Sequence, residues 1–148
     1  MKIKQKKIWV LVADGARARI FVKSHNKLNN VMGQDLVGDN LKDSDIYMDK
    51  PGRGFESNTP TRHAYQPRTD WHQYQKHLFA KDLCELLNKA NEESEFDELI
   101  IISPPKTLGE IRGQLGRQTL SKVTAEIPKD ITKLTEHELV NYLDRELV

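Results

Sequence analysis

The sequence predicts a single α/β domain over residues 1–148, with a mixed β-sheet that an amino-terminal β-hairpin opens and helices flank. Two observations support this fold class. Short apolar runs typical of buried strands occur near the start of the chain and again in its second half. After them, apolar residues recur at the three- and four-residue spacing of amphipathic helices. Strands that pair in a hairpin and then alternate with helices are typical of α/β proteins.

The hairpin is predicted from the first apolar run and the residues that follow it. Residues 8–12 (Ile-Trp-Val-Leu-Val) are too few for a helix, and the dipeptide Asp14-Gly15 favours a tight turn. Residues 16–22 then alternate, with apolar side chains on one face and two arginines on the other. A third strand is expected around residues 31–37, interrupted by Gly33.

A long helix and the strongest strand pattern come next along the chain. Apolar residues spaced by four, three and four predict a helix over about residues 71–90, with Asp70 as its cap. Cys84 lies inside this helix, where a lone cysteine is usually a small buried hydrophobe. Residues 98–103 (Glu-Leu-Ile-Ile-Ile-Ser) then form a second apolar strand, which Pro104-Pro105 ends.

Two capping boxes place the remaining helices. Thr107 with Glu110 is expected to begin one helix, and Thr135 with Glu138 a closing helix. A further strand is expected at residues 123–127 between them.

The residues of about 38–70 are predicted to form a long loop, because they lack apolar periodicity and hold half of the six prolines. Within it lies the segment Asp-Lys-Pro-Gly-Arg-Gly-Phe-Glu-Ser at residues 49–57. Arg53 offers a planar set of donors suited to phosphate or carboxylate, and Phe55 is an aromatic anchor. The alternative is that Arg53 pairs with a neighbouring carboxylate and Phe55 only pins the loop to the core.

Two other places have side chains that suit an anion. Arg17 and Arg19 project from one strand face about 7 Å apart, a spacing that matches neighbouring phosphates; the alternative is a solvated charged face. Lys106 and Thr107 follow a strand at the amino terminus of a helix, where free N–H groups favour anions. Capping alone also accounts for Thr107.

The residue patterns for metal binding and catalysis are absent or wrongly spaced. His72 and His77 are five residues apart on a helix, whereas metal pairs use three or four, and His72 is expected to pack on the core face. Asp14 ends a strand as a metal-binding carboxylate would, but the strand at 98–103 ends without an acidic partner. We therefore predict no metal, no cofactor and no catalytic residue.

Composition bounds the location and the partners. Lys and Arg number 23 and Asp and Glu 22, so a nucleic-acid partner has to meet a local patch rather than an overall field. Cys84 excludes an internal disulfide, and no apolar run approaches the roughly 20 residues of a membrane span. The basic start is followed by an apolar run shorter than an export signal needs. A cytoplasmic protein without membrane contact is expected.

Five segments together resemble the bacterial family described as "protein required for attachment to host cells", which is similar to domains of archaeo-eukaryotic peptide-chain release factors. They are Val-Ala-Asp-Gly-Ala-Arg-Ala-Arg-Ile-Phe at 12–21, the loop segment at 49–57, Phe-Ala at 79–80, Ser-Pro-Pro-Lys-Thr-Leu-Gly-Glu-Ile-Arg at 103–112 and Lys-Asp-Ile-Thr at 129–132. The resemblance implies a release-factor-like fold. It does not extend to peptide release, since the chain has no Gly-Gly-Gln sequence.

These observations favour a non-enzymatic binding or regulatory protein with the ribosome, RNA or a protein as its partner. The alternatives are an enzyme acting on a phosphorylated small molecule, bound by Arg17, Arg19, Arg53 and Lys106, and an indirect host-cell attachment factor. Homo-oligomer formation is left open, and Gly109, Gly113 and Gly116 are expected to share a helix face that docks on the loop or a second subunit. The expected binding residues are Asp14, Arg17, Arg19, Arg53, Phe55, Ser57, Lys106 and Arg112.

Overall fold

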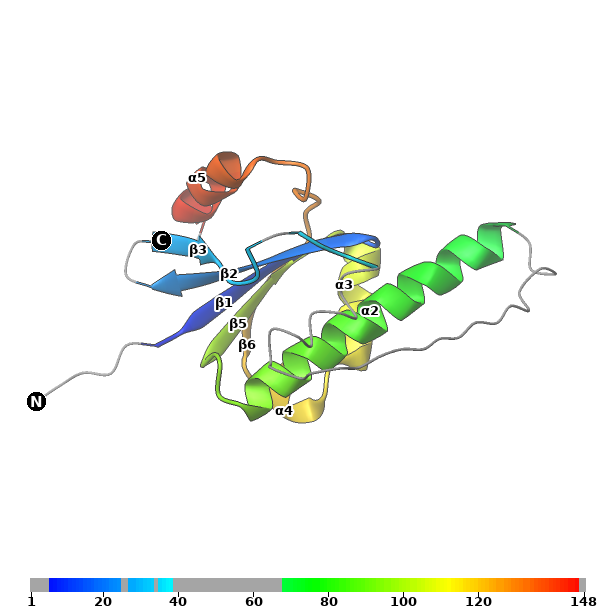
Figure 1. The fold of residues 1–148 in the computed structure, drawn as a ribbon, viewed down its shortest axis with the longest axis horizontal. Coiled ribbons are helices and arrows are strands. Elements are labelled where there is room, and N and C mark those ends of the chain that lie inside the picture. Colours follow the sequence, from blue (N-terminus) through cyan, green and yellow to red (C-terminus); the bar gives the residue numbers. More distant parts are fainter. Residues whose placement is uncertain (1–5, 25–26, 34, 39–67, 147–148) are drawn as a thin grey trace, which may run out of the picture.

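The computed structural model describes residues 6–24, 27–33, 35–38 and 68–146, and its core is a mixed sheet with the strand order β3-β2-β1-β5-β6 (Figure 1). The sheet is antiparallel on one side of β1 and parallel on the other. The α/β fold with a mixed sheet and flanking helices is confirmed. The prediction for the long loop falls mostly outside the described residues.

The amino-terminal hairpin is confirmed. Strands β1 (Ile8–Ala13) and β2 (Arg17–Ser24) pair antiparallel, with Leu11 opposite Ile20. The turn between them is closed by Asp14, whose Oδ1 accepts hydrogen bonds of 2.8 Å from the N–H groups of both Ala16 and Arg17. This is an Asx turn, a conformation that aspartate favours because its short side chain reaches its own backbone.

The expected strand at residues 31–37 is wrong in its placement. The chain returns to β2 twice, as β3 (Lys27–Asn30) and as β4 (Leu36–Val37), and both pair antiparallel with it. Residues 31–33 form a turn instead, because Asn30 accepts hydrogen bonds from the N–H groups of Met32 and Gly33. Gly33 has a φ of 78°, a left-handed conformation that glycine adopts without strain.

The second half of the chain alternates helices with parallel strands. Helix α2 (Arg68–Glu92) precedes β5 (Glu98–Ile102), which pairs parallel with β1. Helices α3 (Pro105–Gln114) and α4 (Arg117–Leu120) then lead to β6 (Val123–Ile127), which is parallel to β5. The closing helix is α5 (Glu136–Glu146). The strands and helices expected in this half are all present.

Of the three helix caps predicted from the sequence, the structure confirms one. Thr135 and Glu138 form the expected capping box of α5, with reciprocal hydrogen bonds of 3.1 and 2.9 Å. The other two caps are wrong. Helix α2 begins at Arg68, two residues before Asp70, and α3 begins at Pro105 without a side-chain cap. Proline at the first helical position has its φ already set and no N–H to satisfy, so the helix starts before Thr107.

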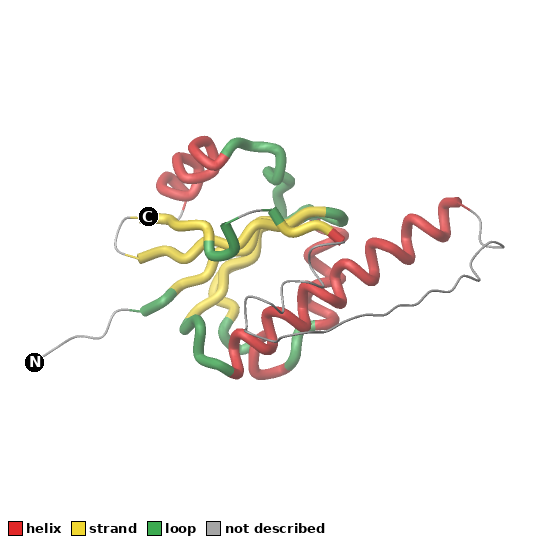
Figure 2. Tube along the Cα trace, viewed as in Figure 1, coloured by secondary structure: helices red, strands yellow, loops and turns green. Residues whose placement is uncertain are grey.

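The alternation of β-strand side chains divides the core between the two faces of the sheet. Trp9, Leu11 and Ile101 point toward α2 and α3, whereas Val10 and Val12 point toward α5. Figure 2 shows the same two layers, with α5 alone on one face and α2, α3 and α4 on the other. Within the described part of the chain, no helix has the length and apolar character needed to cross a membrane.

Candidate functional site

A cavity of about 400 Å³ lies where β1 and β5 end, and we call it the edge cavity. Its walls come from the β1–β2 turn (Asp14, Gly15, Ala16), from α2, from the start of α3, and from Asp130, which follows β6. The carboxyl ends of parallel strands meet at this edge, which is where open α/β sheets commonly bind ligands. A cavity of this volume is in the usual range for small-molecule sites.

Two lysine side chains line the edge cavity together with the carboxylates of Asp14, Glu110 and Asp130. Lys76 comes from α2, and Lys106 from the first turn of α3; Figure 1 shows both helices. Among the described residues neither ammonium group forms an ion pair. Gly15 makes room for the stem of Lys76, since a Cβ there would lie 3.1 Å from the Lys76 Cγ and Cδ atoms. The cavity therefore holds two ammonium groups that form no ion pair with a described residue, although three carboxylates also line it.

A histidine and a glutamate occupy one wall of the cavity. The Nδ1 atom of His77 lies 3.2 Å from Oε1 of Glu110, and the Gln114 amide donates to the same oxygen at 3.1 Å. Both His77 and Glu110 are about half exposed. This contact links α2 to α3 at the cavity wall. The Glu110 carboxylate therefore already has polar partners within the chain.

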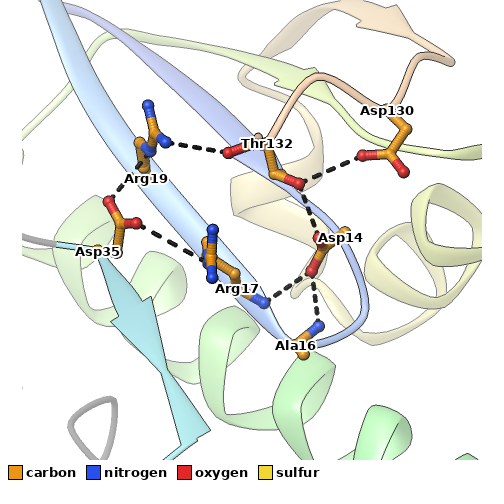
Figure 3. A network of polar contacts seen from close by, with 7 residues as sticks. All are labelled: Asp14, Ala16, Arg17, Arg19, Asp35, Asp130 and Thr132. Atoms are coloured by element: carbon orange, nitrogen blue, oxygen red, sulfur yellow. Dashed lines mark hydrogen bonds and ion pairs between the residues drawn. The ribbon is translucent and has the colours of Figure 1, made fainter. Parts of the chain in front are cut away.

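Two further carboxylates of the lining, those of Asp14 and Asp130, are joined by a buried hydroxyl group, as Figure 3 shows. The Thr132 Oγ1 atom lies 2.7 Å from Oδ2 of Asp14 and 3.2 Å from Oδ1 of Asp130. Burial acts to raise the pKa of Asp14, but hydrogen bonds from Ala16, Thr132 and Arg17 and the charge of Arg17 outweigh it and lower the pKa below 3.8. Asp14 is therefore a carboxylate at neutral pH.

Arg17 and Arg19 share one face of β2, as expected, but they do not form a free cationic surface. Arg19 is 9% exposed; its guanidinium donates to the Thr132 carbonyl at 3.0 Å, and its Nε lies 3.0 Å from Oδ1 of Asp35. The Nε–H is not aligned for a hydrogen bond, so its attraction to Asp35 is Coulombic. Arg17, about half exposed, lies 3.8 Å from the other oxygen of Asp35. A solvated face is the wrong interpretation for Arg19.

The remaining expected site residues are dispersed or not described. Arg112 of α3 pairs with Glu126 of β6 at 3.1 Å and does not line the edge cavity. Arg53, Phe55 and Ser57 lie outside the described residues. Of the eight residues expected to bind, the structure brings Asp14 and Lys106 together in one cavity.

Sequence reasoning missed Lys76 and Asp130. Lys76 stands one helical turn before Ala80, so the stripe that faces the core also marks it as facing the sheet edge. Asp130 follows β6, and it is the acidic neighbour of Asp14 that the end of β5 does not supply. Asp130 could have been found from its place just after β6, because β6 runs parallel to β5 and β1 and parallel strands end at the same edge of a sheet.

The described histidines and Cys84 differ from one another in their positions in the structure. His72 is exposed, which contradicts the expected packing on the core face, and the described residues contain no group of three metal-ligating side chains. Cys84 is buried as expected, and burial, with the nearby charges of Glu110 and Glu85, raises the pKa of its thiol to about 12. A thiol with that pKa is not a nucleophile at neutral pH.

Comparison with known proteins identifies the fold and the family. No protein with a curated description matches the chain. Among solved structures, the crystal structure of the archaeal translation termination factor aRF1 is similar at a TM-score of 0.52 and 12% identity, over 95% of this chain and 39% of that one. This chain therefore spans well under half of that factor. The family described as "Protein required for attachment to host cells" matches residues 9–143, and the chain belongs to this host attachment family.

Proposed function

We propose that this protein is a non-enzymatic binding or regulatory protein of the cytoplasm, and that its partner is translation-related RNA. The observation that carries the proposal is the pair of exposed ammonium groups, Lys76 and Lys106, which form no ion pair with a described residue and line a cavity at the carboxyl edge of the sheet. Lysine is a common phosphate-binding residue in proteins. The likeness in fold to a translation termination factor supports the partner class.

The test is co-sedimentation of the purified protein with ribosomes over a series of salt concentrations. Phosphate contacts release counterions, so binding to RNA should fall steeply as salt rises. We expect the double variant Lys76→Ala, Lys106→Ala to bind roughly tenfold or more weakly and with a shallower salt dependence. Binding that does not respond to salt would indicate a protein partner and would contradict the RNA proposal.

Lys81→Ala is the matched control. Lys81 lies on the same helix as Lys76, is exposed, and pairs with Glu85 at 3.4 Å without lining the edge cavity. It changes the net charge as much as either cavity variant. If Lys81→Ala weakens ribosome binding as much as Lys76→Ala does, the cavity has no special part in the binding. Arg53, Phe55 and Ser57 remain predicted contacts, and Arg53→Ala tests them in the same assay.

An enzyme acting on a phosphorylated small molecule is the second candidate, because the cavity volume suits such a ligand. Of the cations first assigned to this role, Lys106 lines the cavity, whereas Arg19 is buried and paired. Turnover in a screen of phosphoesterase substrates, lost in Lys106→Ala and unchanged by chelators, would establish it. The family description also suits a third candidate, an indirect role in host-cell attachment. With such a role, a deletion strain should attach less well to host cells, while the purified protein should not bind those cells.

A further inference from the structure

The edge cavity combines two kinds of polar group that a single ligand must satisfy together. Lys76 and Lys106 supply hydrogen-bond donors and positive charge, while Asp130 of the same lining supplies an exposed carboxylate. The other lining carboxylates, Asp14 and Glu110, already accept hydrogen bonds from groups of the chain. A bare phosphate suits the lysines but is repelled by the carboxylate. The lining therefore fits a ligand that carries an anionic group and, beside it, a hydroxyl that can donate.

The hydroxyl group of Thr132 lies near two carboxylates but cannot fully satisfy both. The Thr132 hydroxyl has one hydrogen, and two carboxylate oxygens lie near it, at 2.7 Å for Asp14 and 3.2 Å for Asp130. The shorter contact takes the hydrogen, and Asp14 also receives the N–H groups of Ala16 and Arg17. Asp14 is thus well supplied with donors. Asp130 has only the longer contact with Thr132, and its exposed carboxylate lines the cavity as an acceptor.

We propose that the edge cavity holds one ribonucleotide unit of an RNA strand, with its phosphate at Lys76 and Lys106 and its ribose 2′-hydroxyl donating to the carboxylate of Asp130. The inference rests on the proposed RNA-binding function and adds discrimination between RNA and DNA. The 2′-hydroxyl is the group that allows a protein to tell the two apart at one position. DNA has no 2′-hydroxyl, so it cannot donate this hydrogen bond to Asp130. The repulsion between the Asp130 carboxylate and the phosphate remains, and DNA should therefore bind more weakly than RNA.

The experiment compares the affinity of the full chain for an oligoribonucleotide and for the oligodeoxyribonucleotide of the same sequence, with uracil in both, by fluorescence anisotropy at fixed salt. A hydrogen bond to a charged group predicts a preference for RNA of about tenfold or more. Asp130→Ala should reduce that preference to about one, while binding to DNA stays the same or strengthens. Lys106→Ala should weaken both oligonucleotides together.

Asp144→Ala is the matched control, because Asp144 is an exposed aspartate of α5 on the other face of the sheet and its loss changes the net charge equally. It should leave the RNA preference unchanged. Equal, salt-dependent binding of RNA and DNA by the natural sequence would overturn the ribose inference and leave the proposed function standing. Binding of neither would overturn both. Binding of free AMP but of neither oligonucleotide would overturn the assignment to RNA and favour a small-molecule ligand.

Discussion

Two pairs of cationic side chains lie near the same end of the sheet and have opposite environments. Arg17 and Arg19 on β2 both approach Asp35, and Arg19 is buried beneath the segment that contains Thr132. Lys76 and Lys106 line the edge cavity, exposed and without an ion pair among the described residues. Charged residues in the sequence therefore do not by themselves identify a binding surface. Ion pairing and burial determine which lysine and arginine side chains remain available to a partner.

The largest expected effect is on stability, at the buried member of the first pair. Arg19→Ala removes a hydrogen bond to the Thr132 carbonyl, the ion pair with Asp35 and the packing of the arginine stem. We expect the free energy of unfolding to fall by about 2–3 kcal/mol, measured by urea denaturation.

Arg17→Ala is the control for that change. Its side chain is about half exposed and its contact with Asp35 is 3.8 Å, so its loss should cost about 0.5 kcal/mol or less. Equal losses for the two variants would contradict the assignment of Arg19 as the structural member of the pair.

The cavity lysines should show the reverse behaviour. Because both are exposed and form no ion pair with a described residue, the double variant Lys76→Ala, Lys106→Ala should change the free energy of unfolding by no more than about 0.5 kcal/mol while it weakens anion binding. Thermal denaturation beside the binding assay measures both. A large loss of stability would show that these lysines, like Arg19, serve the fold.

Asp14 connects the two regions and predicts a pH dependence. Since folding lowers its pKa below 3.8, the carboxylate contributes stability above that pH, and the contribution is lost as the pH falls through the folded-state pKa. Asp14→Ala removes the bonds to Ala16, Arg17 and Thr132 and should cost about 1–2 kcal/mol at pH 7. Its unfolding curves at pH 7 and pH 3 should differ less than those of the natural sequence. An unchanged pH dependence would remove Asp14 as its source.

The last test concerns the glycines of α3. Gly116 lies beyond the helix, next to Asn88, so the expected face of three glycines is wrong. A Cβ added at Gly109 or Gly113 would meet no described atom within 4 Å beyond its own helix. Gly113→Ala should raise the free energy of unfolding by about 0.5–1 kcal/mol, because alanine favours the helix. A loss, or a changed elution volume in size-exclusion chromatography, would instead indicate that this face docks against another segment or a second subunit.

Strands β1, β2, β5 and β6, the hairpin turn at Asp14-Gly15, the burial of Cys84 and the cap of α5 were all predictable from the sequence. These features depend on interactions between residues close in the chain: side-chain alternation, helical spacing and a reciprocal cap over three residues. The start of α3 was missed for an equally local reason, since Pro105 competes with the Thr107 cap and begins the helix first.

The contacts between polar residues, in contrast, depend on tertiary packing. Arg19 reaches the carbonyl of Thr132, 113 positions along the chain, and Asp14 shares the Thr132 hydroxyl with Asp130 from 118 positions away. Lys76 and Lys106 come from two helices that approach each other only because α2 and α3 pack on the same face of the sheet. Local periodicity shows which face of an element is buried, but not which distant side chain that element meets there. The strand order and the packing of the helices determine that partner, and with it the edge cavity.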